Sequence, residues 1–313
     1  MRSKPIIIVP GEPMSVFFEI LFKSLKSKNF KSPLILITSI KILKLEMKNN
    51  NFKKKINFIN SQNLLENKLN NNSINLIDVN YNVSNPNQYI KNCFDIAFKI
   101  LKSGQTYKFI NGPINKSIFL SKKFLGVTEY ISKKFNVKKS AMLIFNKDLS
   151  VCPVTTHLPI KSVSKKISVK LINEKIFLIH SFFKKNFGFK PKIAVTGLNP
   201  HCESTSKFNE DKIIVEPAVK NLKKRGFNIF GPFSADTIFL KQNRKKYDVI
   251  LGMYHDQVLA PIKTLKEYDA INITLGLPFY RISPDHGPNE KMINMKKSSP
   301  ISLIKAIQFL DQR

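Results

Sequence analysis

Cysteine is scarce in this chain, and its few cysteines are widely spaced. Cys93, Cys152 and Cys202 are the only thiols among 313 residues, and no two of them form a Cys-x-x-Cys pair. This spacing excludes a disulfide framework and a cysteine-based zinc site. The pattern is typical of a protein in a reducing compartment, and we expect a cytoplasmic location.

Long apolar runs are missing as well. No uninterrupted stretch reaches the roughly 18 residues that a transmembrane helix requires, so we expect no membrane span and no membrane partner. The apolar run Ile6–Val9 is too short for a signal peptide and is followed directly by Pro10. We expect this run to form a first buried strand rather than a targeting segment.

Three common nucleotide-binding and hydrolase signatures are also absent. The sequence contains no GxGxxG motif, no Walker A motif and no GxSxG nucleophile elbow. A Rossmann dinucleotide site, a P-loop and an α/β-hydrolase serine are therefore not predicted.

Acidic residues are few: 21 Asp and Glu stand against 52 Lys and Arg, which gives a formal charge of +31. Such a charge is typical of proteins that bind nucleic acid or anionic membranes. The lysines, however, are spread over the whole chain among Asn, Ile and Phe, which all have A/T-rich codons. No helix-turn-helix, RNP-like motif or arginine cluster occurs. We attribute the charge to genome composition, with a general preference for anionic ligands as the alternative, and expect no nucleic-acid partner.

The chain is 42% hydrophobic, and short apolar runs alternate with longer amphipathic segments. Non-alternating Ile, Val and Leu runs indicate strands buried on both faces. We predict an α/β fold with a largely parallel sheet. The predicted strands are Ile6–Val9, Leu34–Thr38, Lys108–Asn111, Ala141–Phe145, Val151–Thr155, Lys192–Thr196 and Val249–Gly252, and the predicted helices include Val16–Ser27, Pro86–Lys102, Ser164–Asn186, Lys212–Arg225 and Ile301–Leu310. The Asn- and Lys-rich stretch Lys48–Asn75 is expected to form surface loops around a small strand or helix.

Three of the five histidines follow predicted strands: His157, His201 and His255. Ligands of open α/β sheets bind beyond the carboxyl ends of the strands. Neutral imidazoles that converge from distant segments are typical holders of a divalent cation, and these three are too far apart for a zinc finger. We predict a shared catalytic metal site, with hydrogen-bonded loop histidines as the alternative.

Several charged or polar residues near these segments are candidates for further roles. Asp256 directly follows His255 and could orient it, act as a fourth ligand or bond loop amides. Arg281 follows a Gly-Leu-Pro turn and could grip phosphate or carboxylate with two bonds, Lys263 could pair with an anion, and Asn272 could add a hydrogen bond. Lys116 lies in a Gly-Pro loop and could reach a phosphate, although such loops usually only reverse the chain.

Together these motifs resemble the 4-hydroxythreonine-4-phosphate dehydrogenase family of vitamin B6 synthesis. The most specific stretch is Met253-Tyr254-His255-Asp256-Gln257, followed by Asn272-Ile273-Thr274-Leu275-Gly276-Leu277-Pro278-Phe279. The similarity also covers Pro10–Pro13, Asn111–Lys116, Thr128-Glu129, Val154–His157, Gly197–His201, Gly231-Pro232, Ala235–Thr237 and Asp285–Gly287.

This resemblance implies a two-domain isocitrate/isopropylmalate dehydrogenase-like fold. Residues 1–128 with 284–313 would form the first domain, and residues 129–283 a second domain that carries the metal ligands and dimer contacts. The active site would lie in the inter-domain cleft at a homodimer interface, with ligands from both subunits. The resemblance further implies a divalent cation (zinc, magnesium, cobalt or similar) on His157, His201 and His255, and substrate contacts from Thr128, Lys263, Asn272 and Arg281.

The implied reaction is the NAD-dependent oxidation and decarboxylation of 4-phosphohydroxy-L-threonine to 3-amino-2-oxopropyl phosphate in pyridoxal phosphate biosynthesis. NAD, or NADP, would bind without a Rossmann fingerprint. The general base stays open among Asp236, Asp256, Lys116 and a hydroxide on the metal.

Some positions depart from the family pattern. Val127 stands where the family usually has a substrate-contacting histidine, and Cys202–Ser206 replaces a glycine-rich run. Ser15–Glu19 and Pro288–Lys291 also differ from the usual motifs. These changes favour two alternatives: a dehydrogenase of another four-carbon phosphorylated acid, such as phosphothreonate or phosphoerythronate, or a catalytically silent metal-binding relative.

Overall fold

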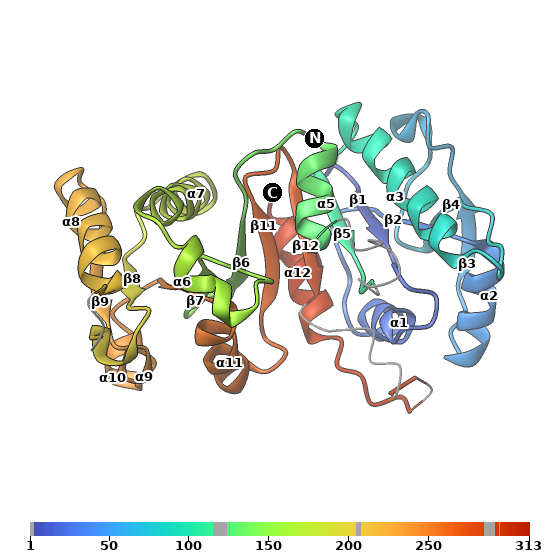
Figure 1. Cartoon of the computed structure of the whole chain (residues 1–313). Helices are drawn as coiled ribbons and strands as arrows, with labels where there is room; N and C mark the ends of the chain where they lie inside the picture. The colour runs from blue at the N-terminus through green and yellow to red at the C-terminus, as the bar shows by residue number, and fades with distance from the viewer. Residues whose placement is uncertain (1–2, 115–123, 125, 205–207, 285–291, 294) are drawn as a thin grey trace. The chain divides into compact units, whose positions relative to one another are not determined.

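The computed structural model describes residues 3–114, 124, 126–204, 208–284, 292–293 and 295–313. The chain divides into two compact units (Figure 1): unit 1 consists of Met1–Val127 with Pro278–Arg313, and unit 2 of Thr128–Leu277. Lys116 and the Asp285–Gly287 motif lie outside the described residues. No helix in the described part of the chain is both long enough and apolar enough to cross a bilayer.

Unit 1 is built on six strands in the order β3-β4-β2-β1-β5-β12, and each neighbouring pair is parallel. Helix α3 packs on β1 and β2, while α12 packs on β12 and α1. The strands are β1 (Ile6–Val9), β2 (Leu34–Thr38), β3 (Lys55–Phe58), β4 (Ser73–Asp78), β5 (Lys108–Asn111) and β12 (Tyr280–Pro284). The helices are α1 (Phe17–Ser27), α2 (Ile40–Asn49), the short η1 (Leu64–Glu66), α3 (Pro86–Lys102) and α12 (Ile301–Asp311).

Unit 2 has a mixed sheet in the order β11-β6-β7-β10-β8-β9. The pairs among β7, β10, β8 and β9 are parallel, whereas β6 is antiparallel to both β11 and β7. The strands are β6 (Ala141–Phe145), β7 (Ser150–Pro153), β8 (Ile193–Thr196), β9 (Ile229–Phe233), β10 (Val249–Gly252) and β11 (Ile271–Leu275). The helical segments are α5 (Val127–Lys134), η2 (Ile160–Ser162), α6 (Val163–Lys166), α7 (Val169–Phe187), η3 (Pro200–Cys202), the π-turn η4 (Asp211–Val215), α8 (Glu216–Lys224), α9 (Ala235–Ile238), α10 (Lys241–Arg244) and α11 (His255–Lys266).

The predicted α/β class and the largely parallel sheet are confirmed. Apolar runs located strands well: β1, β2, β5, β6 and β10 span the same residues as predicted. The long predicted helix Ser164–Asn186 is interrupted, because Ser168 adopts extended backbone and its hydroxyl accepts a hydrogen bond from the Leu171 amide. Such a side-chain cap starts a new helix at that point.

The expectation for Lys48–Asn75 is confirmed in part: loops surround the short strand β3 and the short turn η1, but the last residues begin a further strand. This stretch holds β3 and the start of β4, and β4 is an interior strand that pairs with both β2 and β3. The buried Asn75 makes this possible, since its side-chain amide donates to the carbonyls of Leu34 (2.9 Å) and Asn70 (2.8 Å). A buried amide whose hydrogen bonds are satisfied can occupy a strand interior at little cost.

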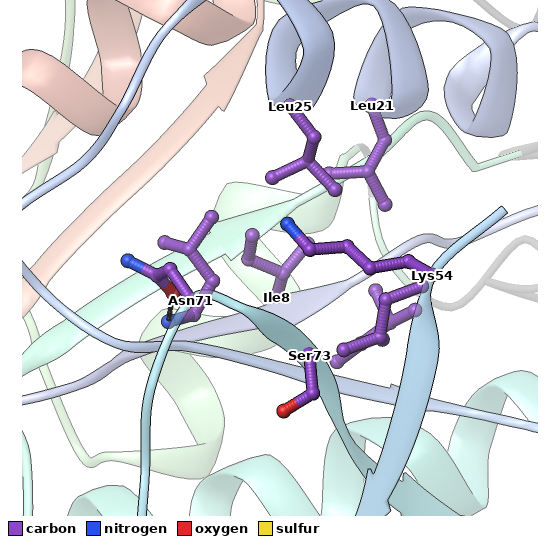
Figure 2. A pocket seen from close by; sticks show the side chains of 9 residues that line it. Ile8, Leu21, Leu25, Lys54, Asn71 and Ser73 are labelled. Carbon is purple, nitrogen blue, oxygen red and sulfur yellow. Dashed lines mark hydrogen bonds between the residues drawn. The ribbon is translucent and has the colours of Figure 1, made fainter. Parts of the chain in front are cut away.

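A small cavity in unit 1 lies beside α1 and the first two strands (Figure 2). Its walls are mostly apolar, and its volume of about 20 Å³ is enough for a single water molecule. Burial lowers the pKa of Lys54, which also lines the cavity. The space is too small to admit a nicotinamide or a phosphorylated acid, so the cavity is not a catalytic site.

Candidate metal and substrate site

Three loops of unit 2 place histidines beyond neighbouring strands. His157 follows β7, His201 follows β8, and His255 begins α11 directly after β10. Because β7, β10 and β8 are adjacent and parallel, their carboxyl ends lie at the same edge of the sheet. This edge is where ligands bind in open α/β sheets.

Helix α11 holds His255 in place through its apolar face. Val258, Leu259 and Ile262 are buried in one cluster with Val151 of β7 and Ile250 of β10. The rings of His157 and His255 come close to each other, with centroids 5.9 Å apart. The packing of one helix on two strands therefore brings two of the three predicted imidazoles together.

Each of the three imidazoles has an oxygen on its Nδ1 side. His255 Nδ1 lies 2.6 Å from an Asp256 carboxylate oxygen, and His201 Nδ1 lies 3.3 Å from the Ser234 hydroxyl. His157 Nδ1 lies 3.9 Å from a Glu129 carboxylate oxygen. The Asp256 carboxylate is an acceptor at His255 Nδ1 and favours the tautomer with its lone pair on Nε2, which is the form that binds a cation.

Glu129 has an electrostatic environment of its own. Burial by itself would raise the pKa of this carboxyl, but the contacts with His157, its own backbone amide and Thr156 lower the pKa below its ordinary value. Its Oε1 also accepts a 3.4 Å hydrogen bond from the Thr156 hydroxyl. Glu129 is therefore held as a carboxylate beside an imidazole, an arrangement typical of metal-binding histidines.

His201 lies on a tightly constrained loop. Its backbone has φ 55°, and the next residue, Cys202, has φ 62°. Left-handed backbone at a non-glycine residue costs on the order of 1–3 kcal/mol and is common at functional sites. The fully buried Asp211 supports the loop by accepting hydrogen bonds from the backbone amides of Leu198 (2.6 Å) and Asn199 (3.0 Å).

The donor chemistry of these loops fits a divalent cation. Imidazoles suit zinc and neighbouring transition metals, and the Asp256 carboxylate favours the required tautomer of His255. Within the described residues, no three His, Cys, Asp or Glu side chains already form a metal-binding group. The structure pairs His157 with His255, and His201 lies beside Ser234 instead.

The predicted substrate residues occupy different environments. Asn272, on β11, has a side-chain oxygen that is buried with no hydrogen-bond partner among the described residues. Thr128 is half-buried on α5 next to Glu129. Lys263 is exposed on α11, one residue after the buried Ile262. An orphaned buried oxygen is unusual and marks Asn272 as a position prepared for a donor.

Arg281 belongs to β12 of unit 1 and is 97% buried, with 3% of its surface exposed. Its Nε donates a 2.7 Å hydrogen bond to the Asn111 side-chain oxygen. Asn111 ends β5, which pairs with β12, so a side chain of the neighbouring strand orients the guanidinium. A guanidinium held in this way is suited to bidentate anion binding.

The candidate bases differ in position. Asp256 is engaged with His255, which favours an orienting role. Asp236 is exposed on α9, two residues after Ser234, and its charge contributes to a raised Cys202 pKa whose main cause is burial. Lys116 lies outside the described residues.

Four residues contact the histidine-bearing loops and were not predicted from the sequence patterns: Glu129, Ser234, Asp211 and Gln257. Glu129 and Gln257 both stand inside motifs that had been noted for their similarity to the family, beside Thr128 and Asp256. Their position in those motifs was the available signal. Nothing in the local sequence of Asp211 or Ser234 indicates the histidine loop that they contact.

Comparisons with known proteins place this chain among dehydrogenases. A family model described as the pyridoxal phosphate biosynthetic protein PdxA matches residues 29–310. The 4-hydroxythreonine-4-phosphate dehydrogenase of Sulfurihydrogenibium sp. is 37% identical over 75% of this chain and 75% of its own length. That of Wigglesworthia glossinidia brevipalpis is 34% identical over 96% of this chain and 94% of its own length.

Solved structures agree. The crystal structure of 4-hydroxythreonine-4-phosphate dehydrogenase from Klebsiella pneumoniae matches with a TM-score of 0.82, 27% identity and 99% coverage of both chains. Isocitrate dehydrogenase from Methylococcus capsulatus matches with a TM-score of 0.51 and 8% identity over 97% of this chain and 84% of its own, which supports a shared fold alone. The predicted isocitrate dehydrogenase-like fold is confirmed.

Proposed function

This chain belongs to the family of the pyridoxal phosphate biosynthetic protein PdxA, and we propose that it acts as a 4-hydroxythreonine-4-phosphate dehydrogenase. The observation that carries the proposal is the set of three imidazoles beyond adjacent parallel strands, each with an oxygen on its Nδ1 side. This arrangement matches the metal-dependent oxidation that the family resemblance implies.

A dehydrogenase of this family implies a nicotinamide cofactor, and we take NAD to be the hydride acceptor. The oxidation removes the proton of the substrate hydroxyl and a hydride from its carbon, and a bound nicotinamide would supply the acceptor for that hydride. The resulting β-keto acid loses carbon dioxide and leaves 3-amino-2-oxopropyl phosphate. Close positioning of donor carbon and nicotinamide is the main requirement for this transfer.

His157, His201 and His255 would hold the divalent cation. When bound there, the cation supplies positive charge that makes the substrate hydroxyl more acidic and the carbonyl more polarised. The chain's own contribution is to orient the imidazoles: Asp256 sets the tautomer of His255, Ser234 lies against His201, and the Glu129 carboxylate lies beside His157. Asp236 is the leading candidate to take the hydroxyl proton, since Asp256 is engaged with an imidazole.

Substrate anions and polar groups would meet Arg281, Lys263, Asn272 and Thr128. The buried guanidinium of Arg281, oriented by Asn111, provides the most fixed positive charge for a phosphate or carboxylate. The buried side-chain oxygen of Asn272 would accept a hydrogen bond from the substrate. We also propose that the two compact units are the two domains, and that the protein functions as a cytoplasmic homodimer whose site draws ligands from both subunits.

One observation favours a second candidate function. Val127 is 8% exposed at the start of α5, directly before Thr128, and a valine can neither donate nor accept a hydrogen bond. The contact usually made there by a histidine is lost, which favours another four-carbon phosphorylated acid as substrate. Phosphothreonate and phosphoerythronate, which carry a hydroxyl in place of the amino group, are the candidates.

Turnover assays test both candidates. NADH formation is measured with 4-hydroxythreonine 4-phosphate, phosphothreonate and phosphoerythronate, before and after treatment with a chelator. We expect cation-dependent NADH formation with 4-hydroxythreonine 4-phosphate as the best substrate. A higher kcat/KM for either other acid supports the second candidate, and no turnover with any of them contradicts both.

A further inference from the structure

Gln257 connects two of the histidine loops through one buried side chain. Its oxygen accepts hydrogen bonds from the Met253 backbone amide (2.7 Å) and the Thr196 hydroxyl (2.8 Å). Its amide nitrogen donates to the Gly197 carbonyl (2.8 Å). Both lone pairs of the oxygen and one N–H are therefore satisfied inside the protein.

The two ends of this bridge lead directly to candidate metal ligands. Met253 lies in the turn between β10 and His255, while Thr196 and Gly197 begin the loop from β8 to His201. Residues some sixty positions apart in the sequence are thus joined by a single amide group. This side chain therefore spans the space between the two loops.

Tight packing leaves these loops little room to shift. A Cβ at Gly252 would clash with Val258 and lie 3.1 Å from the Gln257 side-chain oxygen. A Cβ at Gly197 would lie 2.7 Å from Cys202 Sγ and 2.9 Å from an Asp211 carboxylate oxygen. The two glycines let the backbone approach Gln257 and Asp211 closely enough to be held by them.

Asp211 holds the His201 loop from the other side. The Gln257 amide donates to the carbonyl of Gly197, and the Asp211 carboxylate accepts from the amides of the next two residues, Leu198 and Asn199. Consecutive peptide groups of the loop are therefore fixed by two buried side chains. This support also maintains the left-handed backbone of His201.

The third loop is linked to the same turn. The Thr155 hydroxyl donates to the Met253 carbonyl (2.8 Å), and the Val154 amide donates to the Gly252 carbonyl (2.7 Å). The turn between β10 and α11 is therefore the common attachment point of all three loops. Gln257 is the residue that brings the His201 loop to it.

We propose that Gln257 is a positioning residue that holds the His201 and His255 loops in the conformation that presents their imidazoles to a cation, and thereby strengthens cation binding. The proposal rests on the proposed function in taking these histidines as metal ligands. Catalytic metal sites require their donors to be held within about 0.5 Å of the working geometry, which requires such support. Only an amide fits here, because the site needs two acceptor lone pairs and one donor together.

Cobalt binding by substituted proteins tests this role. Gln257→Met removes all three hydrogen bonds at similar volume, whereas Gln257→Glu keeps the acceptor oxygen and loses the donor to Gly197. Gln242→Met, on the exposed face of α10, is the matched surface control, and Ile179→Val, buried in α7, is the control for a mild loss of stability. The readouts are the Co²⁺ Kd from calorimetry, the visible spectrum of bound Co²⁺, and the melting temperature.

We expect Gln257→Met to weaken Co²⁺ binding by about 10–100-fold and to change the spectrum, as for other residues that orient metal ligands. Gln257→Glu should be intermediate, and both controls should bind like the wild type. In a His201→Ala background, the Gln257→Met effect should shrink, because the residue acts through that imidazole.

Wild-type Kd and spectrum in Gln257→Met would overturn the positioning role, and so would an equal effect in the His201→Ala background. NADH formation by the wild type distinguishes this failure from that of the proposed function. If the wild type turns over substrate while Gln257→Met binds Co²⁺ normally, only the role of Gln257 is wrong. If the wild type neither binds Co²⁺ nor forms NADH, both are wrong.

Discussion

The carboxyl ends of the parallel strands are closed differently in the two units. In unit 1, the loops after β1 and β5 are held backbone to backbone: the Gly112 amide donates to the Val9 carbonyl (2.8 Å), and the Glu12 amide donates to the Pro113 carbonyl (2.9 Å). In unit 2, the loops after β7, β8 and β10 also have backbone bonds, such as the Val154 amide to the Gly252 carbonyl (2.7 Å), but the side chains of Thr155, Thr196 and Gln257 add further bridges between them.

This difference decides what each loop set can present. Backbone contact requires glycine: Gly11 has φ 85°, and a Cβ on Gly112 would clash with the Pro10 carbonyl. The nearby chemistry in unit 1 is a buried cation, Arg281, suited to anions. The bridged loops of unit 2 carry imidazoles instead, which are suited to a cation.

The largest expected effect is the removal of an imidazole from unit 2. His255→Ala should lower kcat by more than about 100-fold, beyond the loss typical of residues that merely orient a ligand. His180→Ala is the matched control, since this histidine belongs to α7 and packs against Phe227. Steady-state rates and circular dichroism check both variants, and a wild-type rate in His255→Ala would remove this imidazole from the site.

Next in size is the loss of the buried guanidinium in unit 1. Arg281→Lys removes the bidentate fork and the bond from Nε to Asn111, so we expect KM for the phosphorylated substrate to rise about 10–100-fold. Arg225→Lys, at the exposed end of α8, should leave KM unchanged. Equal KM values for Arg281→Lys and the wild type would exclude an anion-binding role.

A smaller effect should come from crowding the backbone contact of unit 1. Gly112→Ala places a methyl group against the Pro10 carbonyl and 2.7 Å from the Phe17 ring, and should cost about 1–3 kcal/mol of unfolding free energy. Gly104→Ala has open space around its Cβ and carries only the strain of its φ of 74°. Urea unfolding compares the two, and a greater loss in Gly104→Ala would contradict the close packing.

The smallest effect concerns buried thiols, one in each unit. Burial raises the pKa of Cys93 in unit 1 and of Cys152 in unit 2 to about 12 each. A raised pKa means that each thiol's contribution to stability is complete below about pH 9 and is lost as pH rises toward 12, at up to about 1.4 kcal/mol per pH unit. Cys152→Ala should reduce the fall of the unfolding free energy with pH, measured by urea unfolding between about pH 9 and 11. An unchanged slope would show that Cys152 ionises equally in both states.

Much of the fold follows from local pattern. Non-alternating runs such as Ile6–Val9 and Val249–Gly252 located their strands, because strands buried on both faces need apolar side chains throughout. The same rule failed at β4, where Asn75 reads as a loop residue and is instead buried with its amide satisfied by two carbonyls.

The site shows a similar division. Its histidines stand out in sequence because they directly follow strands, and the parallel topology then gathers those strand ends. The residues that support them do not stand out, since Gln257 and Asp211 act on loops that only the folded chain brings to them. Hydrogen bonds between residues far apart in the sequence produce no local sequence pattern from which they could be predicted.

The most direct test of the account is NADH formation from 4-hydroxythreonine 4-phosphate after a chelator has removed bound cations and a single divalent cation has been returned. We predict that the rate vanishes with the chelator, returns in proportion to cation bound per protomer, and does not return in His255→Ala. A chelated protein that still forms NADH at the wild-type rate would contradict the three-histidine site.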